Sequence, residues 1–298
     1  MAMAGIGWPL AAQTPLPASP PASSPATPAD IIARAPPSAW ADIPSDQILV
    51  MTLDGGGHVL MQLAPIVSPE HVERMQALAR AHWWDGTAVY RVQDDYVAQW
   101  GDRSERKPLP PGLTATLPEA YSIPRAQAGP GLVALPFPDS YARETGFLRG
   151  WPVAMDGDRL WLTHCYGMVG AARDLAPNAG NGAELYAVIG HAPRQLDRNI
   201  ALVGRVVAGI DQLSSLPRGT EKLGMYGDKQ MPKPILSVRL ASDLPPGERP
   251  MLQMMDTGSP SFTAYVRARA NRDDSFFRVP AGGVDVCNIP VPTREKTR

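Results

Sequence analysis

Short apolar runs separated by turn residues dominate the chain from residue 47 to residue 240. Runs at 47–54 and 58–64 flank three glycines, and this arrangement predicts a β-hairpin. The segment 85–102 reads as two short strands about a turn. Further apolar runs predict strands at 159–162, 167–172, 184–189, 200–207 and 235–240.

Two segments within this region have the apolar spacing of helices. Ser68 and Pro69 supply an N-cap and a first-turn proline. An apolar stripe follows at helical spacing, formed by Val72, Met75, Leu78, Ala79 and His82. A shorter helix is predicted over 209–216. Many strands with two separated helices predict a mainly β fold, a barrel or a sandwich, rather than alternating βαβ units.

The composition changes at both ends of this region and inside it. Residues 1–45 contain ten of the 33 prolines and little charge, which predicts a disordered or polyproline II arm. Repeated prolines predict an extended surface insertion at about 103–150, with room for a short hairpin of its own. Residues 46–242 would then form the folded barrel. Residues 243–298 form a C-terminal extension whose predicted helix presents the apolar residues Phe262, Tyr265, Val266 and Ala270 to the body.

The charge and cysteine content exclude several classes of function. The 28 basic and 29 acidic residues nearly cancel, so nothing favours nucleic acid or an anionic membrane surface. No run reaches the roughly 18 apolar residues of a membrane span. The two cysteines and five scattered histidines predict no metal site, and one disulfide in an oxidising compartment remains open.

The first residues bear on the compartment. Residues 3–12 are apolar and end in Ala11-Ala12-Gln13, which resembles the region of a signal-peptide cleavage site. The positively charged start of such a peptide is missing, since the first basic residue is Arg34. A periplasmic or secreted protein is expected, and a cytoplasmic one is the alternative.

Arg91 is the most informative candidate for chemistry. Strict alternation places Val89, Arg91 and Gln93 on one face of a strand. A partly buried arginine must find partners or line a cleft, because an unpaired buried charge is costly. One interpretation is an ion pair with Asp94, Asp95 or Asp102. The other is a functional cation.

Other catalytic schemes find less support. Thr163-His164-Cys165 suggests a Cys-His nucleophile, but adjacent residues on a strand point to opposite faces. No G-x-S-x-G turn occurs, so a hydrolase would lack its usual serine turn.

The order of motifs from residue 46 to residue 242 resembles the cyclophilin-type peptidyl-prolyl cis-trans isomerases. In that family a helix, a turn, an arginine strand and a glutamine ahead of Gly-Asp occur in this order. The matching segments are Trp84-Asp85-Gly86, Val89-Tyr90-Arg91, Gln99 to Asp102, Gly167 to Ala172, the loop 177–182, Glu184-Leu185-Tyr186 and Leu196-Asp197.

The resemblance implies an eight-stranded antiparallel barrel capped by two helices, which isomerises X-Pro bonds in unfolded or exposed polypeptides without a cofactor or metal. It implies that Arg91 and Gln99 are catalytic. The family's substrate-binding positions correspond to Tyr96, Val97, Ala172, Glu184, Tyr186 and Leu196.

Several positions depart from the family pattern. Ile200 replaces the active-site histidine, Val203 replaces a pocket phenylalanine, and Arg173 replaces an asparagine. Gln195 stands where the family has tryptophan, which argues against tight cyclosporin binding. These departures favour an alternative function, a binding module or chaperone that has lost most turnover. A scaffold that acts through the C-terminal helix is a third interpretation.

Overall fold

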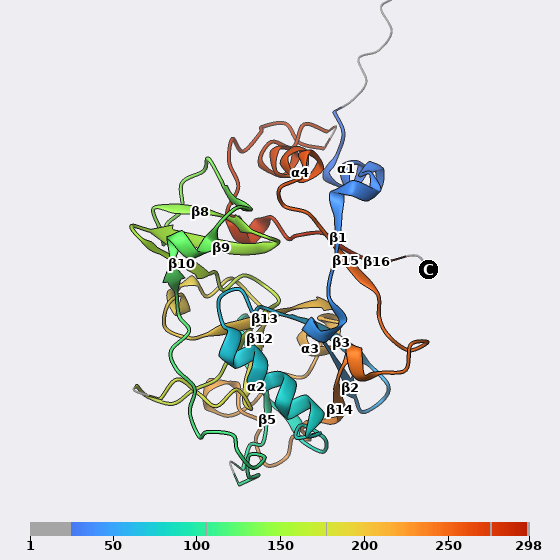
Figure 1. Cartoon of the computed structure of the whole chain (residues 1–298), viewed down its shortest axis with the longest axis vertical. Coiled ribbons are helices and arrows are strands. Elements are labelled where there is room, and N and C mark those ends of the chain that lie inside the picture. The colour runs from blue at the N-terminus through green and yellow to red at the C-terminus, as the bar shows by residue number, and fades with distance from the viewer. Residues whose placement is uncertain (1–24, 105, 177, 275, 297–298) are drawn as a thin grey trace, which may run out of the picture.

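The computed structural model describes residues 25–296 apart from residues 105, 177 and 275. The described part contains four α-helices, α1 (Pro28–Arg34), α2 (Pro69–Arg80), α3 (Asp211–Ser214) and α4 (Pro260–Ala270). None of these helices is long and apolar enough to cross a membrane. Most of the regular structure is β, and Figure 1 shows the barrel below a second, smaller sheet.

Eight antiparallel strands close into a barrel in the order β11-β12-β5-β4-β14-β2-β3-β13. The mainly β prediction with an eight-stranded barrel is therefore confirmed. In chain order the barrel strands are β2 (Ile48–Leu53), β3 (His58–Leu63), β4 (Ala88–Val92), β5 (Val97–Gly101), β11 (Met168–Ala171), β12 (Leu185–Val188), β13 (Leu202–Ala208) and β14 (Lys233–Leu240).

The barrel core forms because one face of each strand and one face of α2 are apolar. The predicted stripe of α2 is buried at Val72, Met75, Leu78 and Ala79. His82 lies beyond the end of the helix with 59% of its side chain exposed. Burial of each large apolar side chain contributes roughly 1.5–3 kcal/mol to the free energy of folding.

The extended surface insertion predicted at about 103–150 contains regular structure in its second half. A five-stranded sheet in the order β6-β10-β9-β8-β7 begins there. Its strands are β6 (Ile123–Pro124), β7 (Leu132–Ala134), β8 (Glu144–Leu148), β9 (Trp151–Asp156) and β10 (Arg159–Leu162). Arg149 and Gly150 join β8 to β9 with φ of 46° and 88°, the positive values that a tight hairpin turn requires.

The prediction of a disordered arm through residue 45 is wrong for residues 28–42. α1 begins with a capping box in which the Thr27 hydroxyl accepts from the Asp30 amide and the Asp30 carboxylate accepts from the Thr27 amide. The strand β1 (Trp40–Asp42) pairs with β15 (Leu252–Met255). Proline at the first turn of α1 favours the helix instead of breaking it. Residues 1–24 of the predicted arm lie outside the described residues.

The C-terminal extension closes a third sheet in the order β1-β15-β16, with β16 spanning Thr293–Glu295. The four apolar residues of α4 that were expected to face the body are all buried. They pack against Phe147 of the second sheet and Trp40 of β1. A disulfide between Cys165 and Cys287 links the extension to the loop between β10 and β11.

A buried arginine joins all three sheets. The Arg205 guanidinium on β13 donates to Gln62 Oε1, to the Gly150 carbonyl oxygen and to Met254 Sδ. It also lies over the ring of Trp151, 4.9 Å from the centroid. Burial lowers the pKa of Arg205 to about 10, so the group remains charged at neutral pH.

The disulfide should stabilise the fold, because it spans 122 residues of chain. Replacing both cysteines in Cys165→Ser with Cys287→Ser should lower the free energy of unfolding by about 2–4 kcal/mol. Denaturant unfolding of the variant and the wild type measures this difference. Equal midpoints for the two proteins would contradict the prediction.

Candidate active site

Arg91 lies on β4 opposite Gln99 of β5. The strand pairing shifts between Val89 and Arg91, so Val89 faces the barrel core while Arg91, two residues further on, is only half-buried. The prediction that these two residues share a face is therefore wrong. A β-bulge re-aims the side chains that follow it, and here it turns Arg91 out of the core toward a groove.

Three neutral oxygens fix the Arg91 guanidinium. Its Nε donates to the Leu223 carbonyl oxygen at 2.7 Å, Nη1 donates to Gln99 Oε1 at 2.9 Å, and Nη2 donates to Gln93 Oε1 at 2.7 Å. Because a guanidinium has five N–H groups, these bonds leave two for a further acceptor.

No ion pair joins Arg91 to a carboxylate in the part of the chain that the structure describes. Asp94 pairs with Arg218, Asp95 accepts from the His191 amide, and Asp102 accepts from amides of its own loop. The ion-pair interpretation of Arg91 is therefore not supported.

Burial lowers the pKa of Arg91 from its usual value, because the charged form loses hydration. An arginine nonetheless stays protonated near neutral pH. The groove therefore presents a positive charge that neutral groups orient and that no carboxylate neutralises.

Gln99 continues the hydrogen-bond chain behind Arg91. Its Nε2 donates to the Tyr90 hydroxyl at 2.7 Å, and that hydroxyl donates to Glu184 Oε2 at 2.7 Å. The other Glu184 oxygen accepts from the Asp102 amide. Because Gln99 is fixed on one side by Tyr90, its oxygen is aimed at Arg91.

A small pocket of about 170 Å³ opens beside the guanidinium. Its apolar floor comes from Val97 and Tyr186 on two neighbouring strands, with Tyr96, Ala172 and Ile200 packed against them. The lining residues of the pocket are Arg91, Tyr96, Val97, Gln99, Ala172, Arg173, Tyr186, Leu196 and Ile200.

The structure brings together seven of the eight residues that the sequence singled out. Glu184 is the exception, because it lies in a neighbouring groove with Tyr90 and Lys107. Two residues of the pocket were treated only as departures from the family pattern, namely Arg173 and Ile200. The sequence signal that could have placed these two residues in the pocket was that Arg173 directly follows Ala172 and that Ile200 stands where the family has its active-site histidine.

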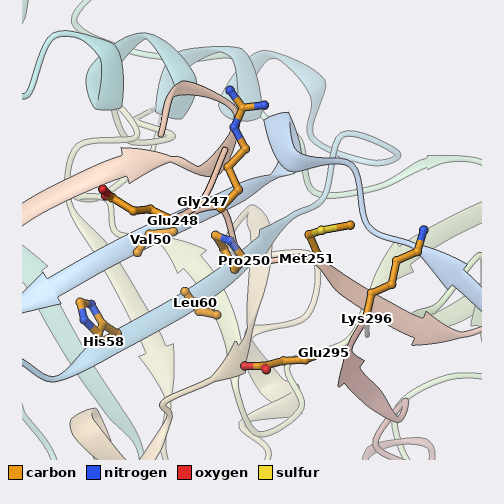
Figure 2. A pocket seen from close by; sticks show the side chains of 10 residues that line it. Val50, His58, Leu60, Gly247, Glu248, Pro250, Met251, Glu295 and Lys296 are labelled. Atoms are coloured by element: carbon orange, nitrogen blue, oxygen red, sulfur yellow. The ribbon is translucent and has the colours of Figure 1, made fainter. Parts of the chain in front are cut away.

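A larger groove of about 790 Å³ lies elsewhere, between the barrel and the third sheet. Val50 and Leu60 form its aliphatic floor, and Glu248, Glu295 and Lys296 surround it (Figure 2). None of the residues around Arg91 lines it, so this larger groove and the candidate chemistry are separate.

Comparisons with known proteins agree with this geometry. The family model for cyclophilin-type peptidyl-prolyl cis-trans isomerases matches residues 48–240. A protein of Brucella suis named "Probable peptidyl-prolyl cis-trans isomerase" is 26% identical over 206 residues, which cover 69% of this chain and 88% of that protein. The protein of the same name from Brucella abortus is 25% identical over the same length.

A solved structure extends the likeness beyond the barrel. The crystal structure of a cyclophilin from Hirschia baltica has a TM-score of 0.69 and 26% identity, and the match covers 91% of this chain and 97% of that one. Because the family model matches well over half of the residues, the chain belongs to the cyclophilin-type peptidyl-prolyl cis-trans isomerases and is an isomerase of X-Pro bonds.

Proposed function

We propose that Arg91 is the residue that accelerates rotation of the X-Pro bond. Rotation is slow because the C–N bond has partial double-bond character, with a barrier of about 20 kcal/mol. In the twisted state the prolyl nitrogen regains a lone pair. A guanidinium N–H can donate to this lone pair but not to the planar amide, so it stabilises the transition state selectively.

The hydrogen bonds of Arg91 support this role. Its three neutral acceptors fix the plane of the guanidinium without cancelling its charge. Gln99, itself oriented by Tyr90, provides one of these acceptors. We assign Gln99 the role of orienting Arg91, and its distance of 2.9 Å from the guanidinium supports this assignment.

The pocket beside Arg91 has the size and polarity for a proline ring. Val97 and Tyr186 supply a buried apolar floor, and Leu196 lies at its side. In this proposal the ring packs there, and Ala172 offers its backbone to the extended peptide. The single observation that carries the proposal is this apolar pocket next to an oriented, unneutralised cation.

We further propose that the protein works in an oxidising compartment, the periplasm or outside the cell, on exposed segments of other proteins. The disulfide between Cys165 and Cys287 supports this, because disulfides persist mainly in such compartments. The cytoplasm is the alternative.

Replacing Arg91 should remove most of the activity and leave the fold. Arg91→Ala should lower kcat/KM for an X-Pro peptide by roughly 100-fold, the usual effect of losing one transition-state donor. Arg80→Ala is a matched control, because Arg80 is an exposed arginine paired with Asp243. A protease-coupled assay measures both variants.

The same assay separates the enzyme from a binding module without turnover. A folded wild type that shows no turnover but suppresses aggregation of unfolded chains would favour the module. Full activity of folded Arg91→Ala would refute the assignment of Arg91.

Cyclosporin should inhibit the wild type weakly. Gln195 is exposed beside Leu196 at the position where relatives in the family have tryptophan, so a large apolar contact is missing. Gln195→Trp should tighten inhibition by about tenfold, the effect of about 1.4 kcal/mol of added contact. An inhibition titration tests this, and equal inhibition of the two proteins would contradict it.

The compartment can be tested on cells that produce the natural protein. Fractionation with immediate maleimide blocking of thiols should recover the chain from the periplasm or medium, with both cysteines unmodified until reduction. Recovery from the cytoplasm with two modified thiols would overturn the proposed location.

A further inference from the structure

His164 is a buried histidine that lies behind Tyr186, one of the residues that line the pocket beside Arg91. It lies in the loop between β10 and β11, and its side chain is 1% exposed. Its Nδ1 is 2.9 Å from Asp197 Oδ1, and its Nε2 is 2.9 Å from the Tyr186 hydroxyl oxygen. The imidazole therefore joins a carboxylate to a tyrosine of the proline pocket.

The charges on both sides determine where the protons lie. Burial would raise the pKa of Asp197, but the His164 hydrogen bond and the Arg194 charge outweigh it and hold that pKa below its usual range. Asp197 is thus an acceptor, and Nδ1 is the donor. Burial raises the pKa of Tyr186 well above its usual value, so its hydroxyl keeps its proton. When the imidazole carries one proton, at Nδ1, its Nε2 is left to accept the hydrogen bond from the Tyr186 hydroxyl.

Asp197 is in turn fixed from behind. Its Oδ2 accepts from Arg194 Nε at 2.6 Å and from Trp161 Nε1 at 3.3 Å. Arg194 also donates both Nη groups to Asp139, at 3.0 and 3.1 Å. The side chains of Arg194, Asp139 and Asp197 are only 2%, 2% and 6% exposed. A carboxylate with so many buried donors cannot shift without breaking several bonds.

Both ends of this network reach the pocket. Tyr186 lines it directly, and Leu196 lines it from the turn between Arg194 and Asp197. The Tyr186 ring also lies against Gly170, where a Cβ would come within 2.3 Å of its Cζ and hydroxyl oxygen. The ring is thus confined by glycine backbone on one side and by His164 at its hydroxyl.

We propose that His164 and Asp197 form a positioning unit that sets two walls of the proline pocket, Tyr186 and Leu196. The unit rests on the assignment of this pocket to substrate. It does not touch substrate, so neither residue is catalytic. Because the walls contact the proline ring in the planar and the twisted state alike, the unit should act mainly on KM, whereas Arg91 acts on kcat.

A double-mutant cycle between His164 and Tyr186 tests the unit. His164→Leu leaves the buried Tyr186 hydroxyl without its acceptor, and Tyr186→Phe leaves Nε2 without its donor. Each should raise KM for an X-Pro peptide about three- to tenfold and change kcat less than about twofold. The combined variant places Phe against Leu, so its KM should be no higher than that of His164→Leu.

Tyr265→Phe is the matched control, because it removes another buried tyrosine hydroxyl, which donates to the Pro290 carbonyl oxygen in the C-terminal extension. It should leave KM unchanged. If the KM effects of His164→Leu and Tyr186→Phe multiply in the double variant, or if neither changes KM, the positioning unit is refuted.

A second measurement covers the case in which His164→Leu does not fold. Nitrogen NMR of histidine-labelled wild type should show His164 protonated at Nδ1 and unprotonated at Nε2. The opposite tautomer would overturn the proposal. The turnover of Arg91→Ala tests the assignment of the pocket independently. If Arg91→Ala loses turnover but the His164 and Tyr186 variants leave KM unchanged, the positioning unit fails and the pocket assignment stands. If Arg91→Ala keeps full turnover, the pocket assignment itself fails.

Discussion

A half-buried cation held only by neutral oxygens is the interaction on which the site depends. A carboxylate beside Arg91 would make a stronger pair but would neutralise the charge that the twisted amide needs in the proposed mechanism. The chain instead surrounds it with two glutamine oxygens and one carbonyl oxygen. The nearby aspartates are engaged elsewhere, which keeps the field of the guanidinium directed at the pocket.

The segments outside the barrel help to build the site. Asp139 belongs to the segment between β7 and β8, and its carboxylate binds the arginine that anchors Asp197. Cys165, the neighbour of His164, is bonded to Cys287 of the C-terminal extension. The second sheet and the extension are thus connected to the pocket beside Arg91 through short chains of contacts.

The barrel could be predicted because its strands and α2 have clear apolar patterns and because their order resembles a known family. Of the second sheet, only β10 was predicted as a strand, since prolines or glycines lie inside β6, β8 and β9. The sheet face on which Arg91 lies was predicted wrongly, because a β-bulge breaks the strict alternation of side chains on which the prediction relied. The contacts of His164 could not be predicted because its partners, Asp197 and Tyr186, are distant in sequence.

The most direct test of the account is a crystal structure of the protein with a bound X-Pro peptide. The account predicts the proline ring against Val97, Tyr186 and Leu196, with an N–H of Arg91 facing the prolyl nitrogen. A peptide bound in the groove of Figure 2, or a prolyl nitrogen beyond hydrogen-bond reach of Arg91, would contradict it.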